Sequence, residues 1–189
     1  LARSDTPRAE EAVLDLTELF RANLDETRSL ITLGEELENA RAYVRIEQLR
    51  MGERLRVHWQ VDDLPMQARM PSLTLQPLLE NAILHGVAQL PEGGDVHVDG
   101  SCADGMLLLR IRNPLPLGQV PQEIGDTGNL RRPARTRTPS PSAGDAPTAG
   151  HGIALGNIRE RLQLLHGAKA SLTARRDGDE FVVQLRLPV

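Results

Sequence analysis

Between Pro114 and Ala149 the sequence changes character, because most of the prolines, many glycines and serines and few apolar residues fall in this segment. A segment of this kind cannot bury enough apolar surface to fold on its own. Loops of this length are uncommon inside a compact domain, so we expect either a functional lid or a disordered insertion. The residues on its two sides therefore have to build one fold around it.

The composition narrows the classes of protein to consider. The chain has 189 residues, of which 40% are apolar, which suits one compact domain or one domain with a helical extension. A net charge of −4 and an aromatic content of 2% make nucleic acid an unexpected partner. The single cysteine, Cys102, allows neither an internal disulfide nor a thiolate metal cluster, which indicates a reducing compartment.

The chain is expected to be cytoplasmic, because no apolar run approaches the roughly 18 to 20 residues of a membrane span and no secretory leader is evident. It begins with Leu1 rather than methionine, which indicates that an amino-terminal part of the protein is missing from the sequence.

Two helices are expected before residue 53. Apolar residues recur at three- and four-residue spacing over residues 8–30, and Thr32 and Glu35 form the capping-box pattern that starts a second helix, which ends at Gly52. Two helices joined by a short link form an antiparallel hairpin, whose apolar stripes must be buried on each other or on a second copy of the chain. Residues 1–53 are therefore interpreted as part of a dimerisation region.

The rest of the chain alternates between strand and helix patterns, which predicts an α/β fold. Strands are expected from period-two alternation and helices from apolar residues at helical spacing. The expected elements are a strand at 55–61, a helix from Pro71 to His85, a hairpin over 95–112, a helix at 153–166 and a hairpin over 170–187.

The expected helix from Pro71 carries two polar residues, Glu80 and Asn81, in the middle of an apolar run. An asparagine there is mildly unfavourable and a charge is costly unless it has a partner. An asparagine oxygen is a good ligand for Mg²⁺, which shares its remaining sites with water and phosphate oxygens, and a neighbouring glutamate can polarise one of those waters. The alternative, of about equal weight, is that both side chains lie on a solvent-facing edge of the helix.

The second motif is Gly150-His151-Gly152-Ile153-Ala154-Leu155, followed by Gly156-Asn157-Ile158-Arg159-Glu160-Arg161-Leu162. Glycines let the backbone approach a ligand, and the first amides of a helix point free N–H groups outward at its positive end. The pattern is typical of a phosphate cradle, although glycines before a helix often only make a turn.

Taken together, residues 33–57, 76–86 and 150–162 resemble the LytS-type sensor histidine kinases, and most closely their AlgZ/FimS-like branch. The resemblance implies the GHKL fold, a two-layer sandwich of mixed β-sheet and helices, over residues 54–189, with an ATP lid at about 114–149. It also implies that Asn81 binds Mg²⁺, that Glu80 orients water or metal, and that Asn113 reads adenine. The ATP-binding residues it implies are Asn81, Asn113, Gly150, His151, Gly152, Ile153, Ala154 and Leu155.

The implied activity is transfer of the γ-phosphoryl group of Mg·ATP to a histidine outside this chain, and from there to an aspartate of a LytR/AlgR-type response regulator. Such transfer depends mostly on positioning and charge neutralisation. The resemblance also implies a homodimer, and it is compatible with a membrane anchor in a missing amino-terminal part, at the inner face of a bacterial membrane.

Two other functions compete with this interpretation. Leu84 stands where relatives often have lysine, Ala154 where glycine is common, and Asn113-Pro114 where the family has an aspartate followed by glycines. These differences support a degenerate kinase domain that acts as an interaction module for its regulator. A GHKL ATPase of the gyrase kind is disfavoured, because Pro77 occupies the position of its acidic base.

Overall fold

The computed structural model of the chain describes residues 30–116 and 151–189, so the predicted helix over residues 8–30 falls almost wholly outside the described residues. Four helices and strands precede α3: β1 (Leu30–Thr32), α2 (Leu33–Met51), β2 (Leu55–Gln60) and β3 (Arg69–Pro71). The others are α3 (Leu75–His85), β4 (Gly94–Ala103), β5 (Met106–Pro114), α4 (His151–His166), β6 (Ser171–Asp177) and β7 (Glu180–Pro188). Short 3₁₀ turns follow α2, α3 and α4, at Gly52–Arg54, Val87–Gln89 and Gly167–Lys169.

Five strands form one mixed sheet in the order β2-β4-β5-β7-β6. Strands β2 and β4 run parallel and are joined through α3, whereas every other neighbouring pair is antiparallel. The β4–β5 turn is tight because Asp104 and Gly105 both have positive φ, of 51° and 69°. The predicted hairpins over 95–112 and 170–187 are confirmed as β4–β5 and β6–β7.

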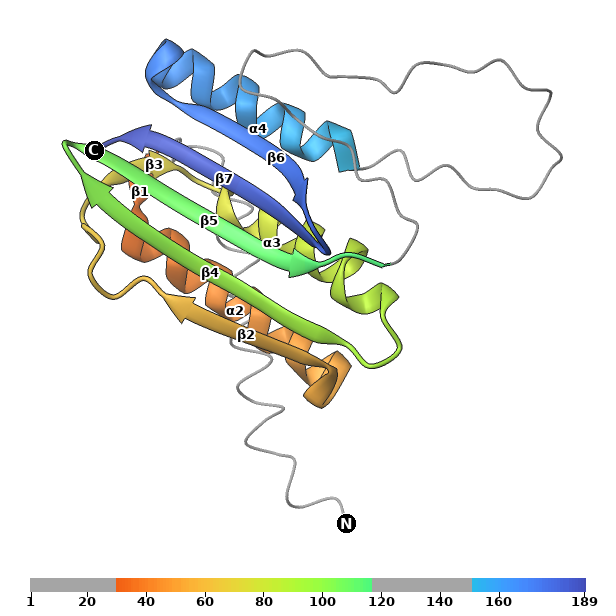
Figure 1. The fold of residues 1–189 in the computed structure, drawn as a ribbon. Helices are drawn as coiled ribbons and strands as arrows, with labels where there is room; N and C mark the ends of the chain where they lie inside the picture. Colours follow the sequence, from red (N-terminus) through yellow and green to blue (C-terminus); the bar gives the residue numbers. More distant parts are fainter. Residues whose placement is uncertain (1–29, 117–150) are drawn as a thin grey trace, which may run out of the picture.

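Helices α2, α3 and α4 cover one face of this sheet (Figure 1). The core between the two layers consists mainly of leucine, valine, isoleucine and alanine, with Met51 and Met70, and with Phe181 as its one buried aromatic side chain among the described residues. Each strand alternates between this core and the opposite face; β5, for example, buries Leu107, Leu109 and Ile111. The predicted two-layer α/β sandwich is confirmed.

Helix α2 begins and ends where the sequence predicts. Glu35 N donates to Thr32 Oγ1 and Thr32 N donates to Glu35 Oε2, at 3.2 and 2.8 Å, which completes the capping box. The apolar stripe of α2 packs into the domain's own core, against α3 and β2, and self-association through the helices stays a prediction. The division of the chain at residue 53 stays a prediction, but α2 shares its core with the sheet.

Helix α3 starts four residues later than predicted, at Leu75 instead of Pro71. Pro71 belongs to β3, which pairs with β1 in a small antiparallel sheet that the sequence analysis did not anticipate. Three-residue strands carry too little alternation to be predicted from a pattern. The helix ends as predicted, with the Gly86 N–H donating to the Ala82 carbonyl at 3.2 Å.

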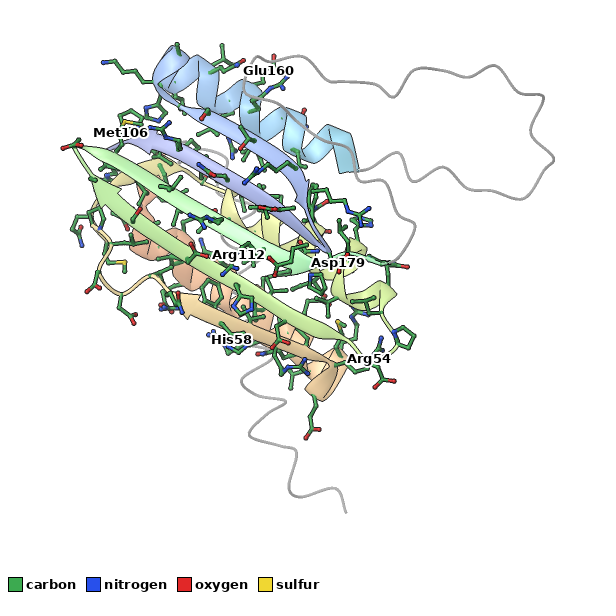
Figure 2. All side chains as sticks on the ribbon, in the orientation of Figure 1. Arg54, His58, Met106, Arg112, Glu160 and Asp179 are labelled. Atoms are coloured by element: carbon green, nitrogen blue, oxygen red, sulfur yellow. The ribbon has the colours of Figure 1, made fainter. Side chains whose placement is uncertain are left out.

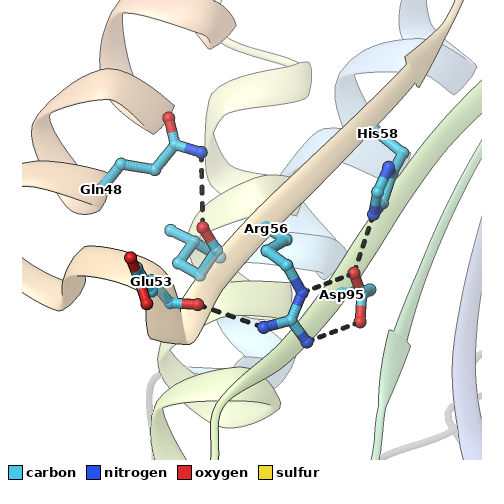
Figure 3. Close-up of polar contacts among 6 residues, drawn as sticks. Gln48, Glu53, Arg56, His58 and Asp95 are labelled. Atoms are coloured by element: carbon cyan, nitrogen blue, oxygen red, sulfur yellow. Dashed lines mark hydrogen bonds and ion pairs between the residues drawn. The ribbon is translucent and has the colours of Figure 1, made fainter.

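The opposite face of the sheet carries polar and charged side chains, among them His58 on β2 and Arg112 on β5, which are labelled in Figure 2. Asp95 on β4 accepts from Arg56 and His58 on β2, with nitrogen–oxygen distances of 2.8 to 2.9 Å (Figure 3). The ring of His58 stacks on His97, with centroids 4.8 Å apart. These hydrogen bonds hold the pKa of Asp95 well below its ordinary value. We call Arg56, His58, Asp95 and His97 the open-face cluster.

No helix in the described part of the chain is long and apolar enough to cross a membrane.

Candidate nucleotide site

The two polar residues in the middle of α3, Glu80 and Asn81, lie on the less buried side of the helix. Leu78, Leu79 and Ala82 are buried, whereas Glu80 is exposed and Asn81 is partly exposed. An unburied glutamate and a half-buried asparagine at mid-helix are free to contact a ligand at the edge of the domain. The exposure of Glu80 also agrees with the alternative that both side chains simply face solvent. The placement is thus compatible with metal binding and with its absence.

Asn113 lies at the end of β5, beside the last turn of α3, and is only 2% exposed. Its Nδ2 donates to the Pro114 carbonyl at 2.9 Å. The close approach requires a glycine at position 86, because a Cβ there would collide with Asn113 Nδ2 and lie 2.5 Å from the Ala82 carbonyl oxygen. Asn113 Oδ1 is buried and has no hydrogen-bond partner among the described residues. This acceptor can receive a hydrogen bond from a ligand.

The glycine motif leads into α4, which begins at His151, two residues before the predicted start. Gly152 therefore lies in the first turn of the helix. Glycine has a low helix propensity, and helix boundaries are uncertain by one or two residues, which accounts for the predicted start at residue 153. Gly150 lies outside the described residues, and for His151, Gly152, Ile153 and Ala154 only the helical backbone is described. Leu155 is buried in the core, so its side chain holds α4 on the sheet.

A phenol on α2 lies within electrostatic range of this part of α3. Burial raises the pKa of Tyr43 above its ordinary value, and the carboxylates of Glu47 and Glu80 act in the same direction. Tyr43 therefore keeps its proton at neutral pH. In the described ranges, 30–116 and 151–189, no group of three or more His, Cys, Asp and Glu side chains could hold a metal ion.

Two charged residues that sequence reasoning missed, the buried Glu36 and the half-buried Arg161, connect the three helices. Glu36 on α2 is 1% exposed and accepts hydrogen bonds from three backbone N–H groups, those of Leu73, Thr74 and Leu75, at 3.1, 2.6 and 2.7 Å. Arg161 on α4 donates to the Leu73 carbonyl and to Thr74 Oγ1, at 3.0 and 3.2 Å. We call these five residues the capping junction.

A signal for Glu36 was present in the sequence. The buried stripe of α2 runs through Leu33, Leu37 and Ala40, and Glu36 falls at the spacing that belongs to this stripe. A carboxylate in an apolar stripe requires a buried partner, although the sequence does not reveal which one. Burial raises the pKa of Glu36, while the three backbone hydrogen bonds and Arg161 oppose that rise.

The sequence is similar to those of sensor kinases. The family model described as "Histidine kinase" matches residues 1–55. The sensor histidine kinase BtsS of Escherichia coli strain K12 is 29% identical over 187 residues, which cover 98% of this chain and 29% of that protein. The sensor protein LytS of a Staphylococcus epidermidis strain is 30% identical over 190 residues, covering 100% of this chain and 30% of LytS. The chain thus spans less than a third of the length of these relatives.

Solved structures agree on the fold. The nucleotide-free catalytic domain of histidine kinase ThkA superposes with a TM-score of 0.55 at 15% identity, over 84% of this chain and 93% of that one. ThkA in complex with response regulator protein TrrA gives a TM-score of 0.50 at 12% identity, over 100% of this chain and 53% of that one. The described part of the chain therefore has the fold of a histidine kinase catalytic domain, and its sequence is similar to those of the LytS and BtsS sensor kinases.

Proposed function

We propose that this chain is the ATP-binding catalytic part of a two-component sensor histidine kinase, and on its motifs we assign it to the AlgZ/FimS-like branch. The observation that carries the proposal is the unpartnered, buried Oδ1 of Asn113, on a fold shared with the ThkA catalytic domain. A buried acceptor of this kind costs stability unless a ligand or water donates to it.

Asn113 suits an adenine base. Its Nδ2 already donates to Pro114, so the oxygen is the atom left for a ligand, and the exocyclic amine of adenine is a donor. A neutral amide makes a weaker hydrogen bond than the carboxylate that the family usually has there. We therefore expect modest affinity. Helix α3 is held firmly against the core beside the proposed adenine site, because its apolar residues Leu78, Leu79 and Ala82 are fully buried.

Asn81 and the amino-terminal end of α4 suit the metal and the phosphates. When bound, Mg·ATP supplies the γ-phosphoryl group for transfer. Mg²⁺ usually takes one or two protein ligands beside water and phosphate oxygens, so a single amide oxygen from Asn81 is a sufficient protein contribution. Glu80 is exposed beside it and can orient a metal-bound water. The first backbone N–H groups of α4, from His151 onward, are available to an anion at the helix end, and we assign Gly150 and Gly152 to the same phosphate-binding segment.

The remaining parts of the proposal concern the longer protein. The acceptor histidine lies outside this chain, the phosphoryl group passes to a LytR/AlgR-type response regulator, and the kinase acts as a homodimer. The structure of ThkA with TrrA supports a regulator as partner, because it shows one kinase of this fold in such a complex. Residues 117–150, which contain most of the proposed ATP lid, lie outside the described residues. A cytoplasmic position, and a membrane anchor in the longer protein, are likewise proposals.

The experiment is calorimetric titration of the purified chain with Mg·ATP. We expect saturable binding that Asn81→Ala loses in its metal-dependent part and Asn113→Ala weakens at least tenfold with and without metal. Asn81→Ala should leave thermal unfolding nearly unchanged, because a half-buried metal ligand contributes to the ligand more than to the core. Gly156→Ala is the matched control, since a Cβ at Gly156 meets nothing within 4 Å.

Flat titrations at millimolar nucleotide, from a chain that unfolds cooperatively, would contradict the proposal. They would support the degenerate interaction module, which Leu84 and Ala154 already favour in sequence.

A further inference from the structure

The capping junction joins three helices at one buried point. Glu36 comes from α2, the turn Leu73–Leu75 leads into α3, and Arg161 comes from α4, 88 residues after Leu73. The contacts join residues that lie 37 to 88 positions apart in the chain, so the junction is a tertiary contact and not a local cap.

The turn before α3 depends on this contact. Leu73 has φ of 53°, a conformation that a leucine seldom adopts, and Thr74 at the N-cap position makes no side-chain capping hydrogen bond. The first N–H groups of a helix need acceptors, and Glu36 supplies them from another helix. Glu36 therefore fixes where α3 begins, and with it the position of Asn81, six residues beyond Leu75.

Stability alone does not explain the arginine. Arg161 is half-buried, its Nε is buried with no hydrogen-bond partner among the described residues, and burial lowers its pKa. Its Nη2 donates to a carbonyl and to a hydroxyl, the Leu73 carbonyl and Thr74 Oγ1. A desolvated cation in such a setting is commonly no more stabilising than an apolar side chain of similar size. Helix α4 already packs on the sheet through Leu155, Ile158 and Leu162.

The arginine instead fixes a relation between two helices. Apolar packing of α4 on the sheet is non-directional and leaves small shifts along its axis inexpensive, whereas two hydrogen bonds to the α3 turn specify one position. Helix α3 carries Asn81, and α4 carries the helix start proposed to bind phosphates. An error of about 1 Å between two such groups is enough to impair a positioned site.

We propose that Arg161 is a positioning residue, which sets α4 relative to α3 through the Leu73 carbonyl and Thr74 Oγ1 so that the two halves of the nucleotide site stay in register. The inference rests on the proposed function for its consequence, and on the capping junction for its geometry.

The test compares Arg161→Met, Arg161→Lys and the matched control Glu160→Gln, an exposed neighbour on the same helix. The Kd for Mg·ATP should rise about tenfold in Arg161→Met. It should rise about threefold in Arg161→Lys. Lysine keeps the charge, and its ammonium can donate to both acceptors as Arg161 Nη2 does, but its flexible stem holds the donor less firmly than the planar guanidinium. Glu160→Gln should match the wild type. All titrations are done well below the unfolding midpoint of each variant, so that a loss of fold cannot mimic the effect.

A second readout does not depend on nucleotide. Amide hydrogen exchange of α4 over residues 155–160, in the free chain, should accelerate about tenfold in Arg161→Met and remain unchanged in Glu160→Gln. If the wild type binds no Mg·ATP, the proposed function fails, and exchange alone decides on the junction. The inference is overturned if Arg161→Met has the same Kd for Mg·ATP and the same exchange rates in α4 as the wild type. If that variant does not fold, the same two results in Arg161→Lys overturn it.

Discussion

Two carboxylates lie on opposite faces of the same sheet, and each accepts several hydrogen bonds. Glu36 belongs to α2 on the helical side of the sheet and is 1% exposed, with three backbone N–H donors from the turn before α3. Asp95 sits on the open face, with its side chain 39% exposed, and its donors are the side chains of Arg56 and His58. Glu36 accepts from N–H groups at the start of α3 that have no local capping side chain. Asp95 links two strands, β2 and β4, that are already paired through their backbones.

The difference shows that the number of hydrogen bonds does not measure what a charged residue contributes. Without Asp95, Arg56 and His58 can turn to water. Without Glu36, the buried N–H groups of Thr74 and Leu75 and the partly buried N–H of Leu73 lose their acceptor, because the turn has no other capping side chain. The cost of losing a carboxylate therefore depends on whether its donors can reach solvent.

The largest effect is expected for Glu36→Ala. Removing the acceptor costs about 1 to 3 kcal/mol for each of the two buried N–H groups and less for that of Leu73, and relief of the buried charge offsets part of that loss. We expect the free energy of unfolding to fall by about 2 to 4 kcal/mol, measured by urea denaturation.

Glu38→Ala is the control for this variant. Glu38 lies two residues away on the same helix, its side chain is 65% exposed, and it pairs with Arg41. Helix-surface pairs three or four residues apart contribute about 0.2 to 0.5 kcal/mol. Equal losses in Glu36→Ala and Glu38→Ala would show that the capping junction has no special weight.

A smaller effect is expected in the dependence of stability on pH, with opposite signs for the two carboxylates. The pKa of Glu36 is raised in the folded state, so between its ordinary and raised values the folded chain binds more protons than the unfolded chain. Stability from this group falls as pH rises through that interval. The pKa of Asp95 is lowered, so stability from Asp95 is present above the ordinary value and lost as acid reaches the lowered one.

Denaturation from pH 8 downward, for the wild type and for Glu36→Gln, tests this sign. The wild type should gain stability relative to Glu36→Gln as pH falls toward the ordinary pKa of a glutamate, about 4.3. A difference that stays flat, or shrinks, would mean that burial does not control the charge of Glu36.

Most regular elements could be predicted from local patterns. The capping box at Thr32, the alternation in β2 and the glycine turns of both hairpins are each encoded within a few residues, and the structure confirms them. The start of α3 could not be predicted in this way. Its capping carboxylate comes from Glu36, 38 residues before Thr74, so no short stretch of sequence contains both residues.

The residues of the candidate site also fall into those that local sequence patterns reveal and those whose contacts depend on the fold. Glu80, Asn81 and the glycine motif stand out because polar or flexible residues interrupt an apolar pattern. The buried, unpartnered oxygen of Asn113 depends instead on the approach of Gly86 from another element, and Arg161 on a turn 88 residues away. Sequence patterns indicated which residues could act, whereas the contacts that position them arise only from the fold.

The smallest effect is expected for Asp95→Asn. The amide keeps the shape of the side chain and one acceptor oxygen, while Arg56 and His58 remain exposed and can hydrogen-bond water. Exposed ion pairs are screened by solvent and typically contribute about 0 to 1 kcal/mol. Asp95→Asn should therefore lower the free energy of unfolding by no more than about 1 kcal/mol at pH 7, and 0.5 M NaCl should reduce that difference further, as expected when the Debye length shrinks to about 4 Å. Urea denaturation at low and high salt measures both quantities. A loss as large as that of Glu36→Ala, or one that salt does not change, would mean that the open-face cluster is shielded from solvent and that the contrast between the two faces is wrong.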